Sequence, residues 1–155
     1  MKTGDLENRS RRDNIVVYGI PETQGGERET WGECEEAVRE VLSDKLEIED
    51  ADRDEKVGIE RAHRLGRRKE GGKPRPIIVK LTRNKSKSEI LRQARSKLKH
   101  SQVNISEDFS FPVREKRRKL IPHLVKAREE GKEAFIRFDK LVINSTPYEV
   151  NVNRR

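Results

Sequence analysis

The residues best able to do chemistry in this sequence are arginines and lysines concentrated in one central stretch. Residues 59–100 carry 15 basic and 3 acidic side chains, whereas residues 20–58 carry 5 basic and 14 acidic ones. The whole chain of 155 residues has a formal net charge of +8. Such separation of charge creates a region that attracts anions, and a chain of phosphates is the anion best matched to an extended basic track. The sequence therefore indicates nucleic-acid binding.

Arginine outnumbers lysine at the start of this stretch, and its planar guanidinium can hold a phosphate through two parallel hydrogen bonds. We expect phosphate contacts to supply most of the affinity, so that binding is indifferent to base sequence and weakened by salt. For any single arginine, a surface ion pair with a neighbour such as Glu60 or Glu115 is the alternative. The predicted phosphate-binding residues are Arg11, Arg12, Arg61, Arg64, Arg67, Arg68, Arg75, Lys80, Arg83, Arg117, Arg118, Lys119 and Arg137.

Aromatic platforms for bases are few. Tyr18 closes a short apolar run and His63 lies beside Arg61 on an expected strand, so these two are the candidates for base stacking. The alternative for Tyr18 is burial under a helix, and for His63 it is ordinary packing or hydrogen bonding. Trp31, at the start of an expected helix, is interpreted as a core or cap residue.

No catalytic set is recognisable. The chain lacks a GxxxxGK[ST] loop, an HExxH motif and paired cysteine ligands. Acidic neighbours are expected to raise the pKa of the lone Cys34, which disfavours a reactive thiolate. We therefore expect no enzyme, no cofactor, no metal and no small-molecule substrate. No run approaches the roughly 20 apolar residues of a membrane span, so no membrane association is expected.

The periodicity of the first two thirds of the chain alternates between strand and helix. Short β-branched runs predict strands, and two capping boxes, Thr30 with Glu33 and Ser86 with Glu89, predict helix starts. On the strand expected at 57–65, Ile59, Arg61 and His63 are predicted to share one face. The resulting order, β-α-β-β-α-β, is that of an α+β, ferredoxin-like sheet. The expected strands are 14–19, 57–65, 75–82 and 103–105.

The last third predicts a second, smaller unit. Ser110 can cap a helix that begins near Phe111, Pro122 should kink that helix or begin a second segment, and Gly131 can end it. Three short strands are expected at 134–138, 140–143 and 148–152. The predicted organisation is a linker or residual end of an upstream coiled coil over 1–12, a first domain over 13–106, and a carboxy-terminal domain over 107–155.

Several of these strings, in this order, resemble one family. The segments RRDNIVVYGIPE (11–22), ERAHRLG (60–66) and RPIIVK (75–80) resemble the RNA-recognition-motif domain in the first open-reading-frame protein of LINE-type retrotransposons. The segments ISEDFS (105–110), REKRRK (114–119) and AFIRFDKL (134–141) resemble the carboxy-terminal domain that follows it in that family. The resemblance covers roughly residues 9–151.

The resemblance implies a sequence-tolerant protein that binds single-stranded RNA, with single-stranded DNA as a second ligand, and that acts as a nucleic-acid chaperone in a retrotransposon ribonucleoprotein. Family members trimerise through an upstream coiled coil, of which only Leu6–Arg12 could be a remnant here, so a trimer is expected only if such a coil precedes this chain. The expected site is an arginine-rich cleft between the two domains, and the expected location is a cytoplasmic ribonucleoprotein, with the nucleus as a second site. The alternative is a non-enzymatic interaction scaffold whose acidic first helix docks a basic partner.

Overall fold

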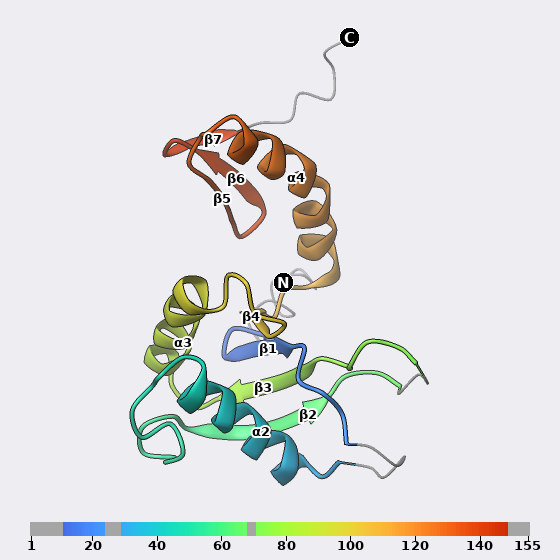
Figure 1. The fold of residues 1–155 in the computed structure, drawn as a ribbon, viewed down its shortest axis with the longest axis vertical. Coiled ribbons are helices and arrows are strands. Elements are labelled where there is room, and N and C mark those ends of the chain that lie inside the picture. The colour runs from blue at the N-terminus through green and yellow to red at the C-terminus, as the bar shows by residue number, and fades with distance from the viewer. Residues whose placement is uncertain (1–10, 24–28, 68–70, 149–155) are drawn as a thin grey trace, which may run out of the picture. The chain divides into compact units, whose positions relative to one another are not determined.

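A computed structural model describes residues 11–23, 29–67 and 71–148 of the chain, with the side chains of 146–148 left out. The α+β prediction is confirmed, because the described residues form a four-stranded antiparallel sheet, a three-stranded sheet and three helices. The described residues up to Asp108 form one compact unit, and the described residues from Phe109 to Tyr148 form a second. Figure 1 labels the elements of both units.

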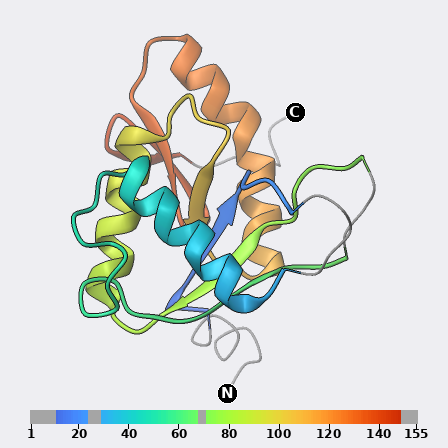
Figure 2. The ribbon, with the colours of Figure 1, turned by 60° about the horizontal axis from the view of Figure 1, so that its bottom comes forward.

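The first unit is built on the four-stranded sheet, whose spatial order is β2-β3-β1-β4. Every neighbouring pair is antiparallel. Figures 1 and 2 show the two helices of this unit, α2 and α3, side by side on one face of the sheet. The elements are β1 (Asn14–Tyr18), α2 (Trp31–Asp44), β2 (Ile59–Arg64), β3 (Ile77–Leu81), α3 (Asn84–Lys97) and β4 (Asn104–Glu107).

The core of this unit lies between the sheet and its two helices. Strand alternation turns every second side chain toward the helices, and those side chains are branched and apolar. Ile15 and Val17 of β1 are fully buried, as are Ile77 and Val79 opposite them on β3. One continuous cluster joins them to apolar residues of the helices, among them Val38, Leu42, Ile90 and Ala94. The helices therefore fix which face of the sheet stays outside the core.

One of the two predicted capping boxes is present. The Thr30 hydroxyl accepts a hydrogen bond from the backbone amide of Glu33, and the Glu33 carboxylate accepts one from the Thr30 amide, so α2 begins as predicted. The Ser86–Glu89 box is wrong. Helix α3 already begins at Asn84, and Ser86 is buried inside it, where its hydroxyl donates to the Lys56 carbonyl.

Strand β2 contains an irregularity that the sequence pattern did not reveal. Its register with β3 shifts between Ile59 and Arg61. This bulge reverses the alternation, so Ile59 enters the core together with Ala62, while Arg61 and His63 face the other side. The expectation that Ile59 shares a face with Arg61 and His63 is therefore wrong.

The second unit is a helix followed by a three-stranded antiparallel sheet in the order β5-β6-β7. Its small core contains Leu120 and Ala127 of the helix with Ala134 and Leu141 of the sheet. Gly131, with a φ of +80°, follows the helix as predicted. The elements are α4 (Phe111–Glu129), β5 (Ala134–Arg137), β6 (Lys140–Ile143) and β7 (Thr146–Tyr148).

Three expectations for the second unit need correction. Of the two alternatives expected for Pro122, the second helical segment is wrong, because α4 continues through this residue to Glu129. The sequence pattern also predicts Ile121 and Val125 on the apolar stripe of this helix, but both are exposed. The last strand begins at Thr146 instead of Tyr148, and residues 149–152 of the expected strand lie outside the described residues.

Gly19 generates the first testable prediction. Its φ is +87°, and a Cβ at this position would overlap the backbone carbonyl of Gln102. Gly66 has a similar φ of +80° but nothing within 4 Å of a built Cβ. We predict that Gly19→Ala lowers the free energy of unfolding by clearly more than Gly66→Ala, whose cost is the backbone conformation alone, about 1–2 kcal/mol. Equal losses in urea denaturation would contradict this reading.

Candidate nucleic-acid interface

The face of the four-stranded sheet turned away from α2 and α3, called here the outer face, collects polar and cationic side chains from all four strands. Arg61 on β2 pairs with Lys80 on β3, which pairs in turn with Asn14 on β1. At the other end of β1, Tyr18 pairs with Asn104 of β4. Residues paired directly across antiparallel strands lie on the same face. The sheet therefore places two cations in one row of the outer face.

These two cations differ in how free they are. Arg61 is exposed, and it forms no ion pair with another described residue. The Lys80 ammonium is one third exposed and lies 3.6 Å from the carboxylate of Glu60. An exposed ion pair of this kind contributes little and can be exchanged for a phosphate. Both side chains can therefore meet an anion on the outer face.

Tyr18 is 40% exposed and belongs to the outer face. The alternative that a helix buries this ring is therefore wrong. Its ring remains a candidate platform for a base at the end of β1.

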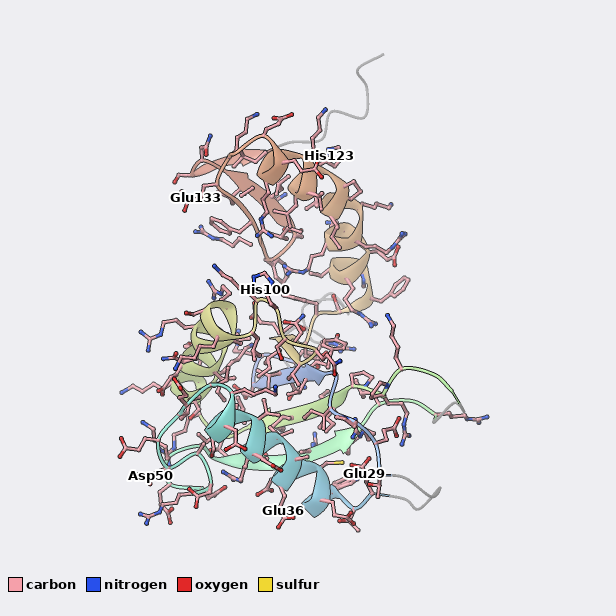
Figure 3. All side chains as sticks on the ribbon, in the orientation of Figure 1. Glu29, Glu36, Asp50, His100, His123 and Glu133 are labelled. Carbon is pink, nitrogen blue, oxygen red and sulfur yellow. The ribbon has the colours of Figure 1, made fainter. Side chains whose placement is uncertain are left out.

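The structure corrects the prediction for Arg64, whose side chain is only 4% exposed. The guanidinium donates to the carbonyls of Ile20, Pro21 and Arg75 at 2.7–2.9 Å. It also pairs with the carboxylate of Glu29, the closest nitrogen and oxygen being 3.1 Å apart. Figure 3 shows Glu29 just before the first turn of α2. Arg64 thus joins the chain after β1, the start of α2 and the chain before β3, and it has no donor to spare for phosphate.

Arg75 and Arg11 are also engaged within the fold. Arg75 pairs with Glu22 at 2.8 Å and donates to the Gly66 carbonyl. The Arg75 hydrogen bond holds the pKa of Glu22 below its ordinary value, with Arg75 and Arg64 charges adding to the effect against the opposing influence of burial. Arg11 pairs with the largely buried Asp108 at 2.8 Å. These two arginines brace loops, and their guanidinium groups are only partly available.

The remaining candidates of the first unit fall into two groups. Arg12, Arg67 and Arg83 are exposed, and none forms an ion pair with another described residue. Arg68 lies outside the described residues. Together with Arg61, these three are the predicted arginines of this unit that stay exposed without an ion pair to a described residue.

The second unit carries its own cationic residues, mostly on α4. The Arg117 guanidinium lies 4.3 Å from the centre of the Phe109 ring and donates to the Phe138 carbonyl, so this side chain holds the end of a hairpin. Arg118 pairs with Glu115 at 3.0 Å in an exposed setting, and Lys119 is exposed. Hydrogen bonding from Arg118 lowers the pKa of Glu115.

Arg137 of β5 is exposed and lies over the ring of Phe135 at 5.8 Å. A guanidinium beside an exposed ring can meet both a phosphate and a base. Arg118, Lys119 and Arg137 therefore remain candidates in the second unit, whereas Arg117 is in large part structural.

Trp31 and His63 form the aromatic pair of the first unit. Their ring centres are 5.0 Å apart and their planes differ by 24°. Trp31 is 59% exposed, which makes its interpretation as a core residue wrong. Cys34 is buried as expected, and its pKa is raised chiefly by burial and next by the charge of Glu29.

Sequence reasoning missed a row of cations on α3. Lys85, Arg92 and Arg95 are exposed and recur at spacings of seven and three residues, which is the signature of a single helix face. This row lies in the helix layer rather than on the outer face. Lys87, by contrast, is buried and donates to the Arg12 carbonyl.

Comparison with known proteins adds no family. No family model matches the chain, and no curated protein matches its sequence. Within 11–23, 29–67 and 71–148, no group of three or more histidine, cysteine, aspartate or glutamate side chains could hold a metal ion. None of the helices described is both long and apolar enough to cross a bilayer.

Arg64 generates a prediction about stability. Removing one partner of a buried pair leaves the other charge uncompensated, so Arg64→Ala should lower the free energy of unfolding by about 3–5 kcal/mol. Arg64→Lys should rescue little, because an ammonium cannot reproduce the planar donor set. Chemical denaturation measures both. The exposed Arg61→Ala serves as the control and should change stability by less than about 0.5 kcal/mol.

The Glu22–Arg75 pair generates a prediction about pH. A carboxylate whose pKa is depressed on folding stabilises the native state above its unfolded value, near 4.5, and loses that contribution as the pH falls. Glu22→Gln should therefore lower the melting temperature at pH 7. The difference in melting temperature between the variant and the parent protein should become smaller at pH 3. A difference that stays constant across this range would contradict the assignment.

Proposed function

We propose that this chain binds single-stranded RNA through phosphate contacts that do not depend on base sequence. The observation that carries the proposal is the outer face, where Arg61 and Lys80 lie side by side at one end and Tyr18 is exposed at the opposite end of β1. In the first unit we assign phosphate binding to Arg12, Arg61, Arg67, Lys80 and Arg83. In the second unit we assign it to Arg118, Lys119 and Arg137.

The architecture supports this proposal by analogy. A four-stranded antiparallel sheet with two helices on one face and the connection order of the first unit is compatible with an RNA-recognition motif, which binds RNA on the helix-free face. The usual aromatic residues of the central strands are replaced here, since β3 offers only Ile78 and Lys80 to the outer face. Phosphate contacts must then supply the affinity, and these carry no sequence information.

The proposal includes the biological role that the family resemblance implies. The chain would act as a nucleic-acid chaperone in the ribonucleoprotein of a LINE-type retrotransposon, located in the cytoplasm and in part in the nucleus. Weak, salt-sensitive contacts suit that role, because strands must be held without being fixed in place. Single-stranded DNA offers the same phosphates, so it is the second ligand. Trimerisation would depend on an upstream coiled coil.

The second candidate is a protein-interaction scaffold, and the acidic surface of α2 favours it. Glu33, Glu36, Glu40 and Asp44 are exposed and recur at helical spacing. A basic partner could bind there without any nucleic acid. The salt dependence of RNA binding separates the two functions.

The test is a salt titration of single-stranded RNA binding, for example by fluorescence anisotropy of labelled RNA. The logarithm of the affinity should fall linearly with the logarithm of salt concentration, by about 0.7 per phosphate contact. Arg61→Ala should weaken binding of different sequences by the same factor and reduce that slope. Arg92→Ala removes the same exposed charge from the helix layer and is the matched control. Undetectable RNA binding at low salt would favour the scaffold, and loss confined to particular sequences would indicate base readout.

A further inference from the structure

The aromatic pair at the edge of the sheet has a geometry that neither phosphate binding nor the core explains. His63 lies on the outer face of the edge strand β2, and Trp31 is the first residue of α2. Their spacing of 5.0 Å and near-parallel planes are those of an offset stack. The His63 Nδ1 atom is buried and makes no hydrogen bond in the described part of the chain. Stacking, rather than hydrogen bonding through this nitrogen, is therefore what orients the imidazole on Trp31.

Trp31 presents a large surface to solvent in spite of this stack. It is 59% exposed, although tryptophan carries the most apolar area of any side chain. The fold does not use it in the core cluster of the first unit. An indole backed by a second ring on one face and open to water elsewhere is a preformed stacking platform, because its orientation is already fixed before a ligand arrives.

We infer that Trp31, backed by His63, stacks an unpaired base of the bound strand. Arg61 shares the outer face of β2 with His63 and lies two residues away, about 7 Å along the strand. That separation is of the order of one nucleotide. Because the Trp31 ring is stacked on His63, a strand whose phosphate contacts Arg61 can place a nearby base on Trp31. The inference rests on the proposed function and adds to it a base-binding site at the sheet edge.

Three of the carboxylates near Trp31 in the sequence are engaged within the fold. Glu29 is paired with Arg64, and Glu35 is paired with Arg39. Glu33 accepts hydrogen bonds from Thr30 in the capping box. Each is therefore compensated in part within the fold. A neutral base meets less repulsion there than a phosphate does, which suits a site where the base enters and the phosphate stays with Arg61.

The chain contains a single tryptophan, so its intrinsic fluorescence reports directly on this site. The experiment titrates the full chain with an oligonucleotide of single-stranded RNA and with an abasic ribose-phosphate strand of equal length. Anisotropy of a label on the strand measures binding independently. We expect both strands to bind and only the base-bearing strand to quench the emission of Trp31.

Two variants separate stacking from simple apolar contact. Trp31→Leu should lower the affinity for the base-bearing strand by at least about fivefold and leave the affinity for the abasic strand unchanged. Trp31→Phe keeps an aromatic face and should retain most of the affinity. Circular dichroism melts of both variants show whether the fold is intact, which the exposure of Trp31 leads us to expect.

The outcomes distinguish this inference from the proposed function. Binding of the base-bearing strand without a change in Trp31 emission, or with equal quenching by the abasic strand, overturns the stacking site and leaves phosphate binding standing. An unchanged affinity of Trp31→Leu for the base-bearing strand overturns it as well. Absence of binding by either strand overturns the proposed function together with the inference. Quenching by a lysine-rich peptide but by neither strand would assign Trp31 to a protein partner.

Discussion

The arrangement of the first unit depends on one buried guanidinium. Arg64 is the last residue of β2. Its guanidinium donates to the carbonyl of Ile20, which follows β1, and to that of Arg75, which precedes β3. It also forms an ion pair with Glu29, just before α2 begins. Four chain segments that are remote in sequence are thereby held at one end of the sheet. A buried charge is tolerated only when its donors are satisfied, so each of those carbonyls is constrained in return. The position of Trp31, two residues beyond Glu29, follows from this constraint.

A basic sequence therefore contains cations with different tasks. Some arginines donate to carbonyls and carboxylates inside the fold, namely Arg64, Arg75 and Arg39. Their guanidinium groups already have partners within the protein. Arg61 and Arg83 face solvent. The net charge governs long-range attraction, because distant phosphates sense the sum of all charges. Close contact depends only on the few side chains that remain free. Counting arginines overestimates the binding site, and burial is what separates the two groups.

Local patterns made much of the fold predictable. The strand at Asn14–Tyr18 and the cap of α2 depend on neighbouring residues alone, and both were read correctly from the sequence. The bulge in β2 was not predictable, because it arises from pairing with β3 and reverses the face to which Ile59 belongs. The burial of Arg64 and the exposure of Trp31 were missed for a related reason. Hydropathy predicts an arginine outside and a tryptophan inside, whereas contacts with remote loops bury Arg64 and the core forms without Trp31.

The bulge at the start of β2 has a consequence for how closely copies of this protein can crowd. Strand β2 is an edge of the sheet, and a straight, apolar edge invites pairing with the edge of another molecule. Here the bulge interrupts the regular row of free amides and carbonyls, and it carries two exposed charged residues, Glu60 and Arg61. A chain with this edge can reach high concentration and still resist joining its neighbours into an aggregate through continuous β-structure.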